Sequence, residues 1–181
     1  MALQYELAAD VLTVEQCERL ITLFGDRVVR STVGLGAQRA VSVVRTSSSF
    51  KIEHGEMPED VLEVLTPCVE GITGLPAENQ ERWEIVRYRE GEHFGQHYDL
   101  VPTPGANGQR LFSAVVSLRA PEAGGRLWFR GHEWALAAGS LLVWRNLRAD
   151  GALDRSARHA SLPVTQGTKW SLVTWIRSAA C

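Results

Sequence analysis

The sequence has few of the features that define several large classes of protein. It contains only three cysteines, Cys17, Cys68 and Cys181, which show neither paired metal-ligand spacing nor a disulfide framework. We therefore expect them to be small core residues and a terminal thiol. No apolar run approaches the ~20 residues that a membrane helix needs, and residues 1–10 lack the basic start and apolar core of a signal peptide. These absences predict a soluble, cytoplasmic protein with no membrane partner.

An excess of positive charge is also absent. The chain has 19 Lys and Arg against 21 Asp and Glu, a formal net charge of -2, and so offers no broad basic surface for a phosphate backbone. A nucleic-acid partner is therefore not expected. A length of 181 residues with 45% hydrophobic and 22% charged residues is typical of one globular domain. Because no repeat or linker interrupts the chain, we predict a single domain over residues 1–181.

Two helices are expected in the N-terminal part. The first follows Thr13, which opens a Thr-x-x-Gln capping box, and its apolar residues recur at helical spacing until Gly25. The second is expected to begin near Pro58 and to end at Gly74. Pro67 is expected to bend or divide this second helix, because proline lacks the N–H that a helix interior uses.

Extended structure is predicted for most of the remaining chain. Two segments before the second helix are rich in Val, Ser and Thr and flank a glycine-containing turn at residues 34–38. After Gln80, short apolar runs alternate with Gly and Pro at near-regular spacing, which is typical of a barrel or sandwich. Eight strands in that part predict a mainly β fold with flanking α-helices: a double-stranded β-helix, or jelly roll, with N-terminal support helices. These eight predicted strands are 83–89, 93–99, 111–118, 126–130, 133–136, 140–145, 158–164 and 168–177. The two earlier segments are 27–33 and 41–52.

The stretch from Tyr88 to Asp99 contains a candidate metal site. His97 and Asp99 are separated by one residue, so on an extended strand both side chains point to the same face. Two protein ligands hold a metal poorly, and His159 is the distal candidate among the five histidines. Two imidazoles and one carboxylate on one side of a metal form the facial triad of non-haem Fe(II) oxygenases.

Lys169 supports this interpretation. By alternation along the last two predicted strands, His159 and Lys169 could both face one cavity. Burying an ammonium group costs free energy unless the group meets an anion. An inward Lys169 therefore predicts a carboxylate ligand, which the far end of a metal-chelating 2-oxo diacid would supply.

Several short motifs occur in one order along the chain. Residues 88–99 read Tyr-x-x-Gly-x-x-Phe-x-x-His-x-Asp, Lys169 follows His159, and residues 175–177 read Trp-x-Arg. This set, over about residues 45–177, resembles the prolyl 4-hydroxylase-like branch of the Fe(II)/2-oxoglutarate-dependent dioxygenases.

The resemblance implies a metal, a cosubstrate and a reaction. In this family, O2 and 2-oxoglutarate are consumed together, 2-oxoglutarate becomes succinate and carbon dioxide, and a C–H bond of the substrate becomes an alcohol. Asp99 favours hydroxylation, because related halogenases lack this carboxylate. The implied site residues are His97, Asp99 and His159 for Fe(II), Lys169 and Tyr88 for the distal carboxylate of 2-oxoglutarate, and Ser113, where the family often has a Thr near that carboxylate.

The same resemblance suggests the substrate class, a small molecule or a peptide. Phe94 occupies a position where prolyl hydroxylases commonly carry a Tyr that contacts the substrate ring, and Trp175 matches a Trp of the same pocket. Arg126-Leu127 departs from the family's usual Glu-Thr after Gly-Gly. The loop from Leu100 to Gln109 is a candidate lid. The first hypothesis is hydroxylation of an amino acid or a peptidyl residue, with proline as the first guess.

Three alternatives remain open from the sequence. One is hydroxylation of a small non-proline metabolite or a carrier-bound amino acid in biosynthesis. Another is a non-catalytic sensor of a metal and a 2-oxo acid, which Asp99 and Lys169 together disfavour. The third is a nucleic-acid repair demethylase, disfavoured by the charge balance and by Lys169, because that branch typically uses Arg for the cosubstrate.

Overall fold

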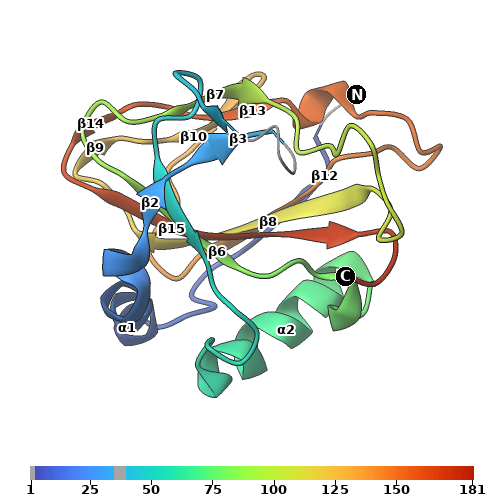
Figure 1. Ribbon diagram of the computed structural model, residues 1–181, viewed down its shortest axis with the longest axis horizontal. Helices are drawn as coiled ribbons and strands as arrows, with labels where there is room; N and C mark the ends of the chain where they lie inside the picture. The colour runs from blue at the N-terminus through green and yellow to red at the C-terminus, as the bar shows by residue number, and fades with distance from the viewer. Residues whose placement is uncertain (1–2, 35–39) are drawn as a thin grey trace.

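The computed structural model describes residues 3–34 and 40–181 and shows two facing antiparallel sheets with both helices outside the larger one (Figure 1). The larger sheet contains, in spatial order, β1 (Tyr5–Ala8), β12 (Leu141–Arg145), β8 (Arg110–Arg119), β15 (Lys169–Arg177), β6 (Glu84–Tyr88), β5 (Ser48–Lys51) and β2 (Val29–Arg30). The smaller sheet contains β11 (His132–Trp134), β10 (Leu127–Phe129), β13 (His159–Ser161) and β7 (Phe94–His97). Two short pairs complete the fold: β9 (Ala123–Gly124) with β14 (Val164–Gln166), and β3 (Thr32–Val33) with β4 (Ala40–Val41). The mainly β architecture with flanking helices is confirmed.

The first helix, α1 (Val14–Phe24), has the predicted capping box. The Thr13 hydroxyl accepts a hydrogen bond from the Gln16 N–H at 3.2 Å, and the Gln16 side chain accepts one from the Thr13 N–H at 3.0 Å. Two of the N–H groups that a helix start leaves without partners are thereby satisfied. The buried side chains of α1, Cys17, Leu20 and Phe24, face the larger sheet.

The second helix, α2 (Glu59–Thr73), is not divided at Pro67, so the first of the two expected effects, a bend, stays a prediction and the second, a division, is wrong. Its buried side chains are Val61, Leu65 and Val69, spaced four residues apart along one face, whereas Pro67 is exposed. The carbonyl that Pro67 cannot bond therefore lies toward solvent, where water can satisfy it. Gly74 ends the helix at a positive φ of 69°, as predicted.

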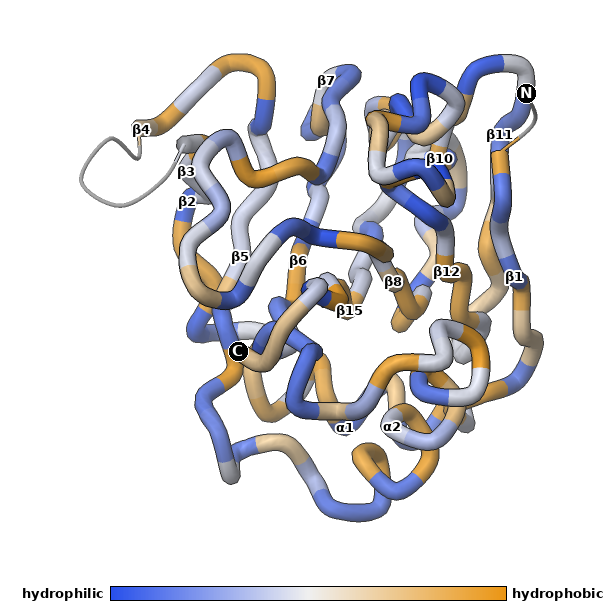
Figure 2. The backbone as a smooth tube through the Cα atoms, turned by 90° about the vertical axis from the view of Figure 1, so that its right-hand side faces the viewer, coloured by the Kyte–Doolittle hydropathy of each residue, from blue (hydrophilic) through white to orange (hydrophobic). Residues whose placement is uncertain are grey.

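Apolar side chains between the helices and the larger sheet form the main core. Figure 2 shows hydrophobic residues along β6 and β8, and buried side chains of both helices belong to the same core cluster. Leu20, Leu65, Ile85, Val116 and Leu172 are each fully buried there. Because this core covers the outer face of the larger sheet, its inner face is left to line the space between the two sheets.

Several strand boundaries differ from the sequence prediction. The expected strand 158–164 is two strands, β13 and β14, because Pro163 between them has no N–H for a ladder. The strand expected over 93–99 ends at His97, so Asp99 lies just beyond it. β1 was not predicted, and the segments 27–33 and 41–52 contain only the shorter strands β2 to β5. Most of the expected turn at 34–38 falls outside the described residues.

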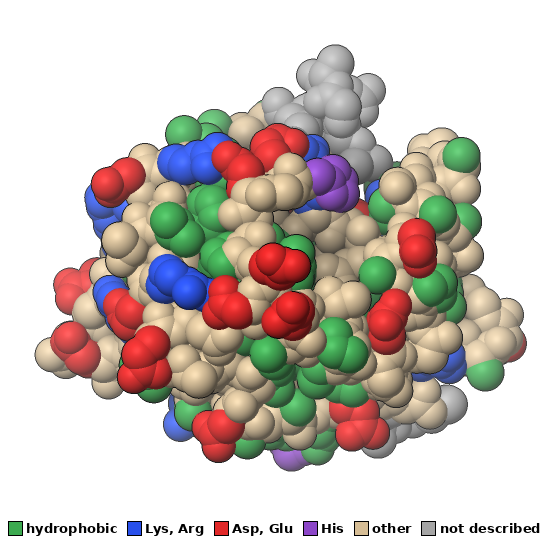
Figure 3. All heavy atoms as spheres, turned by 90° about the horizontal axis from the view of Figure 1, so that it is seen from below, with side chains coloured by type: hydrophobic (Ala, Val, Ile, Leu, Met, Phe, Trp, Pro, Cys, Tyr) green, Lys and Arg blue, Asp and Glu red, His purple; other side chains and the backbone are tan. Residues whose placement is uncertain are grey.

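The face of the molecule on the helix side carries more acidic than basic side chains (Figure 3). Viewed from the helix side, acidic side chains lie among apolar ones, with fewer basic groups between them (Figure 3). Among the described residues, no helix is long and apolar enough to cross a membrane. The absence of a nucleic-acid partner and a cytoplasmic location stay predictions.

Candidate active site

The pairing of β7 with β13 brings two distant histidines together. His97 and His159 are Cα partners across the two antiparallel strands, and their ring centroids are 4.2 Å apart. Asp99 reaches the same place from the turn after β7, with its carboxylate oxygens 3.4 Å from each histidine Nε2. The candidate ligand atoms lie within 4.8 Å of one another, and residues 3–34 and 40–181 contain no other such group of three. The structure thus assembles the predicted metal ligands.

Backbone carbonyls orient both imidazoles. His97 Nδ1 lies 2.8 Å from the Gly95 carbonyl oxygen, and His159 Nδ1 lies 2.9 Å from that of Ala157. Because a carbonyl only accepts hydrogen bonds, each Nδ1 carries the hydrogen and each Nε2 presents its lone pair. Burial lowers the pKa of His159 to about 4, so this imidazole is neutral near pH 7.

Asp99 supplies the negative charge of the site. Burial alone would raise the pKa of its carboxyl group, but attraction to His159 and His97 in their protonated forms and to Arg110 outweighs burial and holds that pKa well below its usual range. The Ser113 hydroxyl donates a hydrogen bond to Asp99 Oδ2 at 2.7 Å. Two neutral imidazoles and one carboxylate are the donor set that Fe(II) takes in facial-triad enzymes, so these residues fit the predicted metal.

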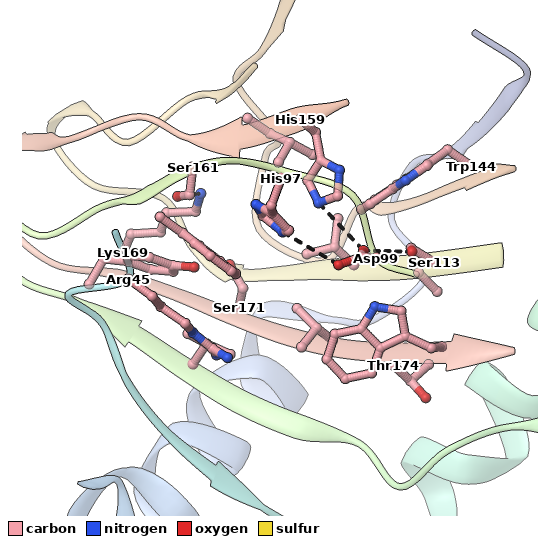
Figure 4. A pocket seen from close by; sticks show the side chains of 18 residues that line it. Arg45, His97, Asp99, Ser113, Trp144, His159, Ser161, Lys169, Ser171 and Thr174 are labelled. Atoms are coloured by element: carbon pink, nitrogen blue, oxygen red, sulfur yellow. Dashed lines mark hydrogen bonds and ion pairs between the residues drawn. The ribbon is translucent and has the colours of Figure 1, made fainter. Parts of the chain in front are cut away.

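Lys169 lies at the other end of the same cavity (Figure 4). Its Nζ donates hydrogen bonds to the Gly125 carbonyl at 2.7 Å and to Ser161 Oγ at 2.9 Å. Tyr88 is its Cα partner across β6 and β15. No carboxylate among the described residues forms an ion pair with Lys169, so its charge is available to an anion in the cavity.

The Gly-Gly pair beside Lys169 has a steric role. Gly125 has a φ of +62°, and a Cβ there would lie 2.8 Å from Pro121 Cγ and 3.4 Å from Lys169 Cδ. A Cβ on Gly124, at φ +74°, would lie 2.5 Å from the Pro163 carbonyl oxygen. Only glycine fits both positions, which let the backbone pass close to the lysine.

Phe94 stacks on a metal ligand because β7 contains a bulge. The Cα partner of Phe94 is Ser161 and that of His97 is His159, so two residues of β7 stand opposite Ala160 alone. In a regular strand these two residues, which are three positions apart, would point to opposite faces. The bulge turns both side chains to the same face, and their rings stack with centroids 3.6 Å apart and an interplanar angle of 13°.

The chain matches a known family over most of the segment that carries these residues. Residues 83–177 match the model of the 2OG-Fe(II) oxygenase superfamily. The chain belongs to this superfamily. The predicted Fe(II), 2-oxoglutarate and O2 are therefore confirmed as the cofactor and cosubstrates of this oxygenase.

Similar proteins point to the predicted branch of the family. Prolyl 4-hydroxylase 5 of Arabidopsis thaliana is 30% identical over 192 residues, which cover 91% of this oxygenase but only 65% of that relative. The oxygenase thus spans less than two thirds of that relative's length.

Solved structures confirm the jelly-roll fold. The viral collagen prolyl hydroxylase of Paramecium Bursaria Chlorella virus-1, in complex with 2OG, has a TM-score of 0.77 at 23% identity, covering 97% of this chain and 96% of that one. A Pseudomonas putida prolyl-4-hydroxylase has a TM-score of 0.65 at 19% identity, covering 96% and 91%.

Ser113 lines the cavity at its metal end, and its place near the distal carboxylate of 2-oxoglutarate stays a prediction. In the pairing of β8 with β15 it stands opposite Trp175, six residues from Lys169, or about 20 Å along the strand. Its hydroxyl bonds to Asp99, at the metal end of the cavity of this oxygenase. The hydroxyl beside Lys169 belongs to Ser161.

Trp175 lines the cavity, as predicted, and is supported by a buried ionic cluster. The Arg110 guanidinium lies 3.7 Å from the centroid of the Trp175 ring. Arg110 donates two hydrogen bonds to Glu81, at 2.7 and 2.9 Å, and Arg177 donates one at 2.7 Å. Glu81 is 8% exposed and joins β8 to β15. The cluster therefore fixes the ring at the metal end of the oxygenase.

Arg45 and Ser161 are among the cavity residues that sequence reasoning did not assign to the site. Arg45 lines the cavity, forms an ion pair with Glu84 at 2.9 Å and lies 5.1 Å from the Phe94 ring centroid. Ser161 was detectable, because it lies two residues after His159 on the same face of the strand. Arg45 gave no such signal, since its partners are distant in sequence.

The candidate lid is anchored at its base. The Gln109 side chain accepts a hydrogen bond from the Val101 N–H at 2.7 Å and donates one to the Val101 carbonyl at 2.8 Å. These bonds join the two ends of the loop. Its closure over a substrate stays a prediction.

Lys169 predicts a pH dependence of cosubstrate binding. Burial lowers the Lys169 pKa from 10.5 to about 8, and the distal carboxylate binds the protonated form. The affinity for 2-oxoglutarate should therefore fall as pH rises through about 8, by at most about tenfold per pH unit. We would measure it by anaerobic equilibrium titration of the metal-loaded oxygenase.

Two variants control this measurement. Lys169→Arg keeps a protonated group and should remove the dependence on pH. Lys169→Ala should weaken 2-oxoglutarate binding at every pH and leave the metal affinity unchanged. A flat profile for the parent chain, or equal cosubstrate affinity in Lys169→Ala and the parent, would contradict the role of Lys169.

Proposed function

We propose that this oxygenase hydroxylates proline, first of all proline within a peptide. One arrangement carries the proposal: the metal ligands, Phe94 and Trp175 face the same cavity. A compact, largely apolar ring such as the pyrrolidine of proline can pack between these aromatic side chains beside the metal. The similarity to prolyl 4-hydroxylases supports the same substrate.

Each residue of the site has a physical role in this proposal. His97, Asp99 and His159 bind Fe(II), and Lys169 orients 2-oxoglutarate through its distal carboxylate. When bound, the metal activates O2 together with 2-oxoglutarate for hydroxylation of a C–H bond. The Phe94 ring covers one face of His97, which restricts rotation of that imidazole and keeps water from it.

The test is a titration followed by product analysis. Apo protein receives Fe(II) and 2-oxoglutarate without oxygen, and the weak visible charge-transfer band of the chelate is recorded. Oxygen is then admitted with a proline-containing peptide, and succinate and hydroxyproline are measured. The control peptide carries alanine in place of proline. We expect stoichiometric hydroxyproline and succinate only with the proline peptide.

Other outcomes would replace the proposal with one of the alternatives. Hydroxylation of free amino acids but not of peptides would indicate a small-molecule hydroxylase. A chelate band that never leads to succinate would indicate a sensor.

Phe94→Tyr tests the substrate pocket directly. The added hydroxyl supplies a polar group at the cavity, and one hydrogen bond contributes about 0.5–1.5 kcal/mol. We expect kcat/KM for prolyl peptides to rise about two- to tenfold. The Fe(II) affinity should not change, because the ring still stacks on His97. An unchanged ratio of products from prolyl peptides and free proline would argue against this pocket.

A further inference from the structure

Ser113 and Asn146 form a buried chain of hydrogen bonds that ends at a metal ligand. Asn146 Nδ2 donates to Ser113 Oγ at 2.9 Å, and Ser113 Oγ donates to Asp99 Oδ2 at 2.7 Å (Figure 4 shows the second bond). Ser113 and Asn146 are each 1% exposed, and Asp99 is 8% exposed. Bulk water therefore does not compete for these bonds.

The backbone of Asn146 holds the start of this chain in place. Asn146 directly follows β12, and its N–H donates to the Leu111 carbonyl at 2.9 Å. Its own carbonyl accepts from the Asp154 N–H at 3.1 Å. Because the main chain is bonded on both sides, the Cα atom from which the Asn146 amide reaches Ser113 is held in place.

Hydrogen-bond directions follow from the groups involved. An amide NH2 only donates and a carboxylate only accepts, so the Ser113 hydroxyl accepts from Asn146 and gives its one hydrogen to Asp99. With the amide turned over, Oδ1 and the Asp99 carboxylate would compete for one hydrogen. Either orientation leaves one buried amide atom of Asn146 unpaired, Oδ1 in the observed one, but the turned-over amide would also lose one of the two hydrogen bonds of the chain. The observed orientation makes the serine a fixed donor toward Asp99.

A fixed donor on Oδ2 has a consequence for metal binding. A carboxylate can bind a metal through one oxygen or both, and the second mode would use a position that the facial triad leaves open. The short bond from Ser113 engages one oxygen of Asp99 and leaves the other for the metal.

We propose that Ser113 and Asn146 are positioning residues that hold Asp99 as a one-oxygen ligand. This inference rests on the metal site of the family and not on proline as the substrate. It also gives Ser113 a task at the metal end of the cavity. Substitution of such supporting residues typically costs about 10- to 100-fold in metal affinity.

The test compares metal binding in four variants. Anaerobic titrations with Fe(II) give affinities, and the visible spectrum of Co(II)-loaded protein reports the coordination number. Ser113→Ala should bind Fe(II) about 10- to 100-fold more weakly and change the Co(II) spectrum. Ser113→Thr keeps the hydroxyl and should retain both properties. Asn146→Ala should weaken binding less, with no further loss when combined with Ser113→Ala.

Ser117→Ala is the matched control. Ser117 lies on the same face of β8, is 5% exposed and donates to the Leu136 carbonyl at 3.1 Å, away from Asp99. This variant should bind metal like the parent chain. Ser113→Cys, with a weak donor of similar size, replaces Ser113→Ala if the latter does not fold, and should show an intermediate loss.

The measurements separate this inference from other roles of Ser113. At saturating metal, 2-oxoglutarate affinity should be the same in Ser113→Ala and the parent. Unchanged metal affinity and Co(II) spectrum in Ser113→Ala, with weaker 2-oxoglutarate binding, would overturn the proposal. No peptide enters the assay, so failure of the proline proposal would show separately, as missing hydroxyproline with normal metal binding.

Discussion

Replacing His159 by alanine is expected to abolish Fe(II) binding and to reduce succinate formation to the level of a reaction without protein. The substitution leaves only two ligands, His97 and Asp99, and an open cavity wall where the imidazole lies. Two ligands hold Fe(II) too weakly to keep it at micromolar concentrations. The same loss is expected for His97→Ala. Both are measured by anaerobic metal titration and by succinate formed per unit time.

His132→Ala controls for the general loss of a histidine. His132 is exposed on β11, outside the cavity lining. This variant should retain metal binding and turnover. Normal succinate formation by either His159→Ala or His97→Ala would remove the metal assignment.

Glu81→Gln is expected to produce the largest loss of folding stability. Glu81 accepts hydrogen bonds from Arg110 and Arg177, and Lys51 lies 3.5 Å away. Removing the carboxylate leaves two largely buried guanidinium groups without their anion, and breaking a buried ion pair costs about 3–5 kcal/mol. That is a large part of the roughly 5–15 kcal/mol that stabilises a typical domain. Urea unfolding followed by circular dichroism measures the loss.

A surface pair and the pH dependence provide the controls. Glu53→Gln breaks the exposed pair with Arg82 and should cost about 1 kcal/mol or less. Burial raises the Glu81 pKa, but Arg110, Lys51 and Arg177 outweigh it, so the folded pKa lies below 4.5. Stability from Glu81 is therefore fully present above pH 4.5 and is lost as pH falls through the folded pKa. A loss below about 1 kcal/mol in Glu81→Gln would show that the cluster does not stabilise the fold.

The metal set and Lys169 were predictable because their geometry depends on short spacings. His97 and Asp99 lie one residue apart and converge even though Asp99 is beyond the end of β7. The order of the motifs along the chain then identified His159 as the third metal ligand and Lys169 as the residue that binds the cosubstrate. For the same reason, local patterns were sufficient to predict that the first helix follows Thr13 and that the second ends at Gly74.

The pairing of strands and side chains that are distant in sequence could not be predicted from the sequence. Alternation gives the face on which Ser113 lies, but only the register of β8 against β15 shows that it stands opposite Trp175 rather than Lys169. The partner of Arg45 is Glu84, on a different strand. A division of α2 at Pro67 could not be ruled out from the sequence, because the effect of a proline depends on whether the freed carbonyl faces water or the core.

The bulge in β7 makes the backbone geometry of that strand as important as its residue types. Phe94 and His97 are three residues apart, so in a regular strand they would point to opposite faces, and the stacked pair would be lost. Deleting Gln96 would remove the extra residue and leave the two side chains two positions apart, on the same face and still opposite Ser161 and His159. The stack is therefore compatible with a bulged spacing of three residues or a regular spacing of two. Related sequences should have one or two residues between these positions, and the exposed position 96 should vary in residue type.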